Sequence, residues 1–453
     1  MSSMATKSLM LLAVIATLAA PVRAADSNEN PYAPKATERA QARENTIANF
    51  RLHDARGLNV FEAPKTDDIK YDGFKMQWGA AFTQQFQSLK HENAASPNVV
   101  GGVDLNKPIA IGSGFNNAEA NLYLDAQLAR GIRVSLTSYL SSRHHNETWV
   151  KDGYLLIDGS PWENETLDNM MKYVTLRVGH MEINYGDMHF RRTDNGQAMF
   201  NPLVGNLLMD AFTTEVGGEV TVRQSDMIGM LAVTGGEVRG QVTKPESRSP
   251  AIIAKLGYDK TFEPGTRVRL TGSIYNTSKA ANNTLYTGSR SGSRYYWVLE
   301  NASATETGRA WSGDIRDGLD FSHKVQAWVI NPFVTYKGLE LFGNIEQAKG
   351  SKLGETSDRK FTQTAGEALY RLPGNNFYVA GRYCTVKGKY STFTASQGDA
   401  TVNRMQVGGG WFLTQTMLAK LEYVDQQYKD FPLNDIRHDG KFKGVMFEAT
   451  VSF

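Results

Sequence analysis

Charged side chains recur at every second position of many segments in this 453-residue chain, and they are the first candidates for chemistry. Where apolar residues occupy alternate positions of a strand, the positions between them form a polar face. This rule assigns to the polar face the bases Lys75, Arg133, Arg143, Arg177, Arg223, Arg267, Arg269, Arg371, Arg382 and Lys420, and the acids Glu119, Asp125, Glu215, Glu219, Glu340, Glu346, Glu367 and Glu422. The basic excess is small, so such a face favours anions mildly. Alternatively, most of these charges are solvated and pair across strands.

A second group of charges lies in the segment 191–214, which has no alternating pattern. Arg191, Arg192, Asp194 and Asp210 accompany six apolar residues there, namely Met199, Phe200, Leu203, Val204, Leu207 and Leu208. A loop exposed to water has little use for six apolar side chains, so the segment is expected to be buried against another surface. That surface is either the interior of the same chain or a neighbouring subunit.

The segment 279–323 mixes arginines with aromatic residues, namely Arg290, Arg294, Tyr295, Tyr296, Trp297, Arg309 and Trp311. Such a mixture could stack on sugars or bind anionic groups. It could equally pack as a lid, or form part of an aromatic girdle at a membrane surface.

Catalysis and metal binding find little support in the sequence. The histidines are dispersed except for His144 and His145, whose side chains would point to opposite faces of a strand. The chain shows no nucleophile elbow, phosphate loop or zinc spacing, and Cys384 is its only cysteine. We therefore expect no enzyme, no cofactor and no metal. The alternative is a barrel protease or lipase whose acid, histidine and nucleophile converge at the rim.

The elements that must position these charges are long strands with a period of two. In the first strand, Phe74, Met76, Trp78, Ala80, Phe82 and Phe86 share one face, and Lys75, Gln77, Thr83, Gln85 and Gln87 share the other. Sixteen such strands are predicted, within 74–87, 117–128, 132–143, 171–179, 182–190, 215–223, 227–238, 250–260, 266–278, 324–337, 338–348, 359–372, 376–390, 401–414, 416–428 and 441–453.

The connections between these strands alternate in length. Short ones such as 130–131, 179–181, 337–338 and 414–415 alternate with long polar ones, namely 91–114, 147–170, 191–214 and 279–323. Short turns at one rim and long loops at the other are typical of a transmembrane antiparallel β-barrel, in which closure satisfies every backbone group. Strands of a soluble β protein would usually be shorter than these.

Composition fits this prediction once the first residues are set aside. A spanning helix needs about 20 consecutive apolar residues, and nothing after residue 24 approaches that length. Of the 49 Lys and Arg, Lys7 and Arg23 lie in the first 24 residues, which contain none of the 47 acids. The remaining chain has equal numbers of bases and acids, so a nucleic-acid partner is not expected.

Residues 1–24 have the three regions of a secretory signal peptide. Lys7 precedes an apolar run over 9–20, which is followed by Pro21 and by the small Ala24 at the expected cleavage site. A membrane-anchoring helix is the alternative, but the run is too short to span a bilayer. Residues 25–72 form a polar periplasmic extension with a short helix predicted over 37–50, and this extension could act as a plug or a trimerisation segment.

The final strand places Val445, Phe447, Ala449, Val451 and Phe453 on one face. Over 73–453 the chain thereby resembles bacterial outer-membrane β-barrel proteins, in which a terminal Phe is read by the barrel-assembly machinery. Size and strand count resemble the sixteen-stranded porins, which are commonly trimers. The segment 183–220 is similar to a poorly characterised porin-like group related to the phosphate-selective porins. In porins the third loop narrows the lumen, and this resemblance makes Arg191, Arg192 and Asp194 candidates for the constriction.

The function expected from the sequence is passive diffusion of small hydrophilic solutes through the bacterial outer membrane. The other pore-lining candidates are Lys75, Arg133, Arg177, Arg267, Arg269, Arg382, Glu119 and Asp125. The expected partners are outer-membrane lipid, lipopolysaccharide, the assembly machinery and two further copies of the chain. The alternatives are a substrate-specific uptake channel plugged by residues 25–72, or an adhesin that binds through its long loops.

Overall fold

The computed structural model describes residues 49–62, 71–142, 148–240, 245–262, 265–287, 294–305, 319–394 and 396–453, and the single residues Ile47, Lys65, Val242, Thr243 and Ile315. Most of the predicted helix over 37–50, Arg143, His144 and His145 lie outside the described residues, as do Arg290, Arg309 and Trp311. Among the helices described, none is long and apolar enough to cross a membrane.

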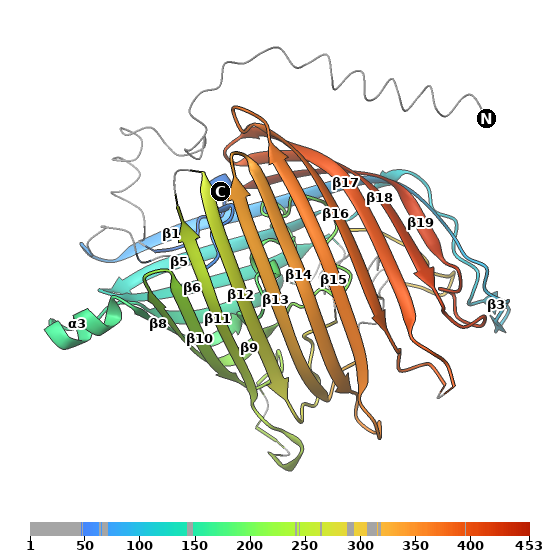
Figure 1. Ribbon diagram of the computed structural model, residues 1–453, viewed down its shortest axis with the longest axis horizontal. Helices are drawn as coiled ribbons and strands as arrows, with labels where there is room; N and C mark the ends of the chain where they lie inside the picture. The colour runs from blue at the N-terminus through green and yellow to red at the C-terminus, as the bar shows by residue number, and fades with distance from the viewer. Residues whose placement is uncertain are drawn as a thin grey trace.

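Sixteen long antiparallel strands in the described part of the chain close into one barrel (Figure 1). They are β1 (Lys75–Glu92), β5 (Glu119–Ala129), β6 (Ile132–Ser141), β7 (Thr148–Ile157), β8 (Val174–Glu182), β9 (Thr214–Gln224), β10 (Met227–Thr234), β11 (Ala251–Thr261), β12 (Thr266–Thr277), β13 (Lys324–Tyr336), β14 (Leu339–Ser351), β15 (Arg359–Arg371), β16 (Phe377–Gly388), β17 (Ala400–Thr414), β18 (Met417–Lys429) and β19 (Lys441–Ser452). Pairing of β1 with β19, from Ala81↔Ser452 to Glu92↔Lys441, closes the ring. Closure leaves no open sheet edge.

Three short strands lie beside the long ones. β4 (Gly114–Phe115) pairs with β1, and β2 (Val99–Val100) pairs with β3 (Val103–Asp104). β4 continues the pairing of β5 along β1 and so extends the barrel wall, whereas β2 and β3 form a separate small sheet in the connection between β1 and β5.

The two faces of the wall reverse the usual distribution of side chains. On β1, Trp78 and Phe82 are 69% and 49% exposed, whereas Thr83 and Gln85, which follow them on the opposite face, are only 3% and 2% exposed. A water-soluble protein buries large apolar residues and exposes polar ones. Apolar residues outside and polar residues inside are the pattern of a barrel that faces lipid.

Short turns gather at the rim where the chain ends. Phe453 exchanges two backbone hydrogen bonds with Ala80 near the start of β1. At the β13–β14 turn, Lys337 and Gly338 have φ values of 44° and 85°, as a two-residue hairpin turn of the primed type requires. The barrel and these tight turns confirm the predicted fold class.

The sequence prediction was wrong around residues 143–190. A strand not predicted, β7, occupies 148–157, and the connection 158–173 with its helix α3 (Glu165–Met171) lies at the short-turn rim, where Asp158 bonds Gly131. The predicted turn at 179–181 lies inside β8. The predicted strand over 182–190 is instead the start of a loop, with a 3-10 helix over Met188–Phe190.

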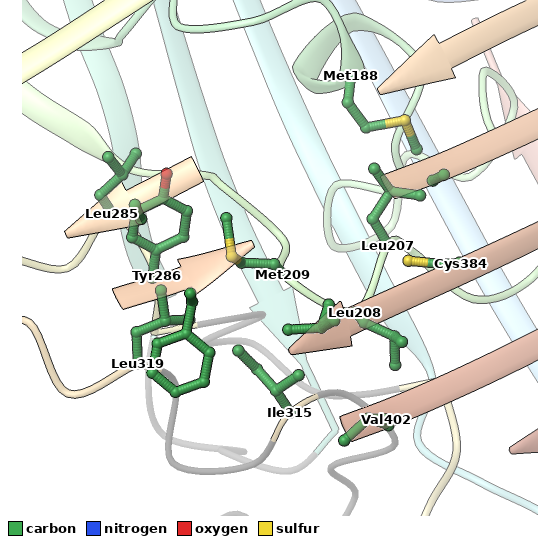
Figure 2. Packing of buried hydrophobic residues seen from close by; sticks show 14 of the residues in the cluster. Met188, Leu207, Leu208, Met209, Leu285, Tyr286, Ile315, Leu319, Cys384 and Val402 are labelled. Atoms are coloured by element: carbon green, nitrogen blue, oxygen red, sulfur yellow. The ribbon is translucent and has the colours of Figure 1, made fainter. Parts of the chain in front are cut away.

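Three connecting segments lie inside the barrel. The first is residues 183–213, which we call the inner loop. The second is residues 49–62, which we call the N-terminal segment. The third consists of the described parts of the 278–323 loop. Figure 2 shows Leu207, Leu208 and Met209 of the inner loop beside Leu285 and Tyr286 of the 278–323 loop, within one buried apolar cluster. The apolar residues of both loops are therefore buried against the interior of their own chain.

Candidate functional site

The inner loop is held to the wall by side chains that point into the lumen. At its start, the Asp187 carboxylate contacts the Lys255 Nζ at 2.9 Å and the Arg269 Nε at 2.8 Å. Its backbone N–H donates to the Asn331 side chain at 2.8 Å. These partners come from β11, β12 and β13, so the loop first follows that part of the wall.

The tip of the loop then crosses to the opposite wall. Asp194 and Gln197 form an isolated β-bridge, and Asn195 donates to the Ala120 carbonyl on β5 at 2.6 Å. Gln197 donates to the Ser452 hydroxyl on β19 at 2.8 Å. The tip therefore contacts the barrel where its first and last strands meet.

The returning half of the loop lies against β15 to β18. Lys420 donates to the carbonyls of Ala198, Asn201 and Leu203 at 2.9 to 3.1 Å. Glu422 accepts the backbone N–H of Val204 at 2.8 Å. A buried polar group is costly unless it is hydrogen-bonded, and here charged wall residues satisfy the backbone of the loop.

The three constriction candidates from the sequence occupy different parts of this path. Arg191 faces β15 and contacts Glu367 at 2.7 Å. Arg192 stays within the loop, with Asp210 at 2.6 Å and Asp194 at 3.4 Å. Asp194 also contacts Lys151 on β7 at 2.6 Å and accepts a hydrogen bond from the Tyr139 hydroxyl. The structure thus brings Arg192 and Asp194 together and directs Arg191 elsewhere.

The other candidates lie on the wall and are engaged in pairs. Those that pair with another wall residue are Arg177 with Glu219 at 2.6 Å, Arg267 with Asp259 at 2.7 Å and Arg382 with Glu367 at 2.5 Å. Those that pair with a connecting segment are Arg133 with Asp158, Arg269 with Asp187 at 2.8 Å, and Glu119 with Arg294 at 2.6 Å. Asp125 accepts from Ser135 at 2.6 Å, and Lys75 reaches the exposed Asp72 at 2.9 Å outside the strand.

The N-terminal segment is fixed near its middle and at its last residue. Ala55 donates its N–H to the Gln415 carbonyl at 3.0 Å, in the turn between β17 and β18. At the C-terminal end of the segment, the Glu62 carboxylate contacts Lys255 at 3.1 Å and Arg269 at 2.7 Å. Burial acts to raise the pKa of Glu62, but these two cations hold that pKa well below its ordinary value. Glu62 is therefore an anion in the folded chain.

A cavity of about 260 Å³ remains between the N-terminal segment, the inner loop and strands β5 to β9, and we call it the chamber. Its charged lining residues are Arg51, Lys65, Lys151, Arg177, Arg192 and Arg223, and Glu62, Asp125, Asp152, Asp158, Glu182, Asp194 and Glu219. Ligand pockets usually measure about 300–1,000 Å³, so this chamber suits a small solute.

One histidine, one carboxylate and one hydroxyl of the chamber lining lie together, but not in the order of a hydrolytic triad. His53, Asp125 and Ser135 lie together, but the carboxylate stands between the other two, with Ser135 at 2.6 Å and His53 at 3.5 Å. A hydrolytic triad needs the histidine between the hydroxyl and the carboxylate. Over the described residues, no group of three His, Cys, Asp or Glu side chains could hold a metal ion.

Sequence reasoning missed three residues that shape this site. Lys151 was not identified because β7 was not predicted. Arg51 and Glu62 were not identified because residues 25–72 have no alternating pattern. The sequence does hold one signal for Glu62. It follows the apolar Phe61 in a polar segment, and such a pair could insert into the lumen, where the carboxylate would meet the bases of the wall. Nothing in the sequence shows where Arg51 points.

The described strands form a closed antiparallel β-barrel, and solved outer-membrane proteins have a similar fold. The anion-selective porin of Comamonas acidovorans has 12% identity and a TM-score of 0.50, with 84% of this chain and 100% of that chain covered. In-vitro folded OmpT, an outer membrane protein of Vibrio cholerae, has 9% identity and a TM-score of 0.49, with 85% and 99% covered. OmpF of Salmonella typhi in complex with daunomycin has 13% identity and a TM-score of 0.45, with 84% of this chain and 98% of that chain covered.

No protein-family model and no curated protein matches the chain. At identities this low, the structural likeness establishes the barrel fold and nothing finer. Function must therefore be argued from the residues of this chain.

Proposed function

We propose that this protein is an outer-membrane channel for the passive passage of small hydrophilic solutes, without catalysis. The observation that carries the proposal is a closed sixteen-stranded barrel whose outer face is apolar and whose interior is lined by charge and contains the chamber. Barrels of about this strand number have room for water, whereas eight-stranded barrels are filled by side chains.

The inner loop sets the narrowest part of the passage in this proposal. The supporting contacts are those of its tip, because Asp194 reaches Lys151 on β7 and Asn195 reaches Ala120 on β5. Overall charge in the chamber is nearly balanced, with six Lys and Arg side chains against seven acids. Any anion preference of the whole pore, as expected from the sequence, is therefore small.

A substrate-specific uptake channel with an N-terminal plug is the second candidate. Glu62 favours it, because a carboxylate that pairs with two fully buried cations anchors the N-terminal segment inside the barrel. Under this proposal, solutes pass when the segment is released. The adhesin alternative is less favoured, since the inner loop and the described parts of the 278–323 loop turn into the lumen rather than outward.

The remaining partners of the chain are proposals that follow from this function. Export by a signal peptide ending at Ala24, insertion by the assembly machinery through Phe453, contact with lipopolysaccharide and a homotrimer are all expected of such a channel. Phe453 is 55% exposed and bonded to β1 through its backbone, so its side chain is accessible. Migration of unheated protein in detergent gels reports the trimer.

Swelling of liposomes that contain the purified protein tests the proposed function. Sugars of increasing size are added outside, and swelling rates report which of them enter. We expect rates that fall steeply with solute size, because the chamber is small. Equal rates with and without the protein would refute a diffusion channel, provided that the protein shows the heat-dependent migration of a folded barrel.

A further inference from the structure

Each of the acids that line the chamber has a basic side chain nearby, although three of them share one lysine. Glu219 pairs with Arg177, Asp158 with Arg133, and Glu182, Asp194 and Asp152 all lie within 3.7 Å of Lys151. The two others also have basic partners, since Glu62 contacts Lys255 and Arg269, and Asp125 lies 3.5 Å from His53. A cationic solute would therefore compete with an existing basic partner at each of these carboxylates.

Arg51 lines the same chamber in a different electrostatic state. Its Nε donates to the Gly57 carbonyl at 3.0 Å and its Nη2 donates to the Phe190 carbonyl at 2.8 Å. Its guanidinium lies 3.8 Å from the centre of the Phe200 ring. Within the described ranges, no carboxylate lies in salt-bridge distance of Arg51. Burial lowers its pKa to about 9, and Glu182 opposes that shift, so the group is a cation at neutral pH.

Arg223 on β9 is the second base of this kind. Its Nη1 donates to the backbone carbonyl of Glu62, and no carboxylate of the described residues lies in salt-bridge distance of it. Both arginines are partly exposed and line the chamber. In the described part of the chain the remaining N–H donors of both arginines have no carboxylate partner, and we infer that they can bind a solute.

We propose that the chamber is a binding site for small anionic solutes bearing carboxylates, and that Arg51 and Arg223 bind the anionic groups. The inference rests on the proposed channel function and names the solute class. A guanidinium binds a carboxylate through two parallel N–H donors, and a partly desolvated site strengthens the attraction. The N-terminal segment then contributes a specificity-determining residue of the pore, in addition to partly closing it.

Three four-carbon solutes of matched length test the proposal: succinate, 1,4-butanediamine and 1,4-butanediol. Ligand-observed NMR titration of the full chain in detergent measures the binding of each, independently of conduction. We expect saturable binding of succinate only. Arg51→Gln and Arg223→Gln should each weaken it about tenfold, and Arg51→Lys should weaken it less, because the charge remains while the paired donors are lost.

Arg130→Gln is the matched control, since Arg130 lies at a turn, pairs with Asp168 at 2.8 Å and does not line the chamber. Heat-dependent migration in gels shows whether each variant is folded. If Arg51→Gln releases the N-terminal segment, Arg223→Gln still tests the proposal, because Arg223 lies on the barrel wall. Equal succinate binding by wild type and both glutamine variants would overturn the proposal, as would tighter binding of the diamine. Succinate binding by a protein that supports no liposome swelling would instead refute the channel function alone.

Discussion

Replacing Glu62 by Gln should release the N-terminal segment. The Glu62 carboxylate joins the segment to Lys255 and Arg269, whose side chains are fully buried, and Asp187 is the other acid that contacts both. Glutamine has nearly the same shape but no charge. The variant therefore leaves one buried positive charge without its compensating anion.

The magnitude follows from the burial of the group. Glu62 keeps only 8% of its side chain exposed, so solvent screening of this cluster is weak. Breaking a buried ion pair by removing one partner costs about 3–5 kcal/mol. Because glutamine keeps an amide oxygen as acceptor, we expect Glu62→Gln to cost about 3 kcal/mol. That energy corresponds to a roughly 100-fold rise in the released population of the segment.

Limited proteolysis measures this population directly. Trypsin cleaves after Arg51 and Arg56, and both bonds lie in the N-terminal segment. When opening is fast relative to cleavage, the cleavage rate is proportional to the open population. We therefore expect mass spectrometry to show cleavage at these two sites about 100 times faster in Glu62→Gln than in the wild type.

Glu163→Gln is the matched control, because Glu163 is exposed in the connection 158–173 and should leave the cleavage rate unchanged. A rate in Glu62→Gln within about twofold of wild type would refute the anchoring role that we assign to this carboxylate. Cleavage elsewhere in the barrel would show that the variant had lost the fold, in which case Lys255→Gln offers an independent disruption of the same pair.

Three further changes probe the inner loop. Lys151→Met leaves Asp194 and Glu182 without their shared ammonium, so the loop tip should detach and single-channel conductance should rise; an unchanged conductance would contradict this. Burial lowers the pKa of His189 below its ordinary 6.5, so below that pH the unfolded chain takes up the proton first and stability falls. The drop in melting temperature from pH 7 to pH 5 should therefore be larger in wild type than in His189→Gln. Gly205→Ala would place a methyl group against the Tyr295 ring and should cost about 1–3 kcal/mol in thermal unfolding, whereas Gly366→Ala, with open space around it, should cost little.

Much of the barrel could be predicted because lipid and water impose a period of two on each strand. The register places Arg177 opposite Glu219, and both had been assigned to the polar face from alternation alone. The same rule failed for β7, where a register shift in its pairing with β6 interrupts the alternation and both Lys151 and Asp152 line the chamber.

The false strand over 182–190 has a related cause. Ile183, Tyr185 and Met188 recur with nearly the spacing of a strand, but they are buried inside the lumen rather than facing lipid. Alternation identifies which side chains are apolar and cannot tell lipid contact from packing between loops. The sequence also could not predict which partners the charged side chains of the inner loop would have. The path of the loop decides this, and it brings Arg191 to Glu367 rather than to water.

Planar-bilayer recording of the purified chain tests the central claim most directly. A channel partly closed by its N-terminal segment predicts steady ohmic steps from the full chain, and larger steps after deletion of residues 25–72. A barrel that is silent until those residues are deleted would support the plugged uptake channel instead. Absence of current from both forms, with each shown to be folded, would contradict the conclusion that this barrel is a channel.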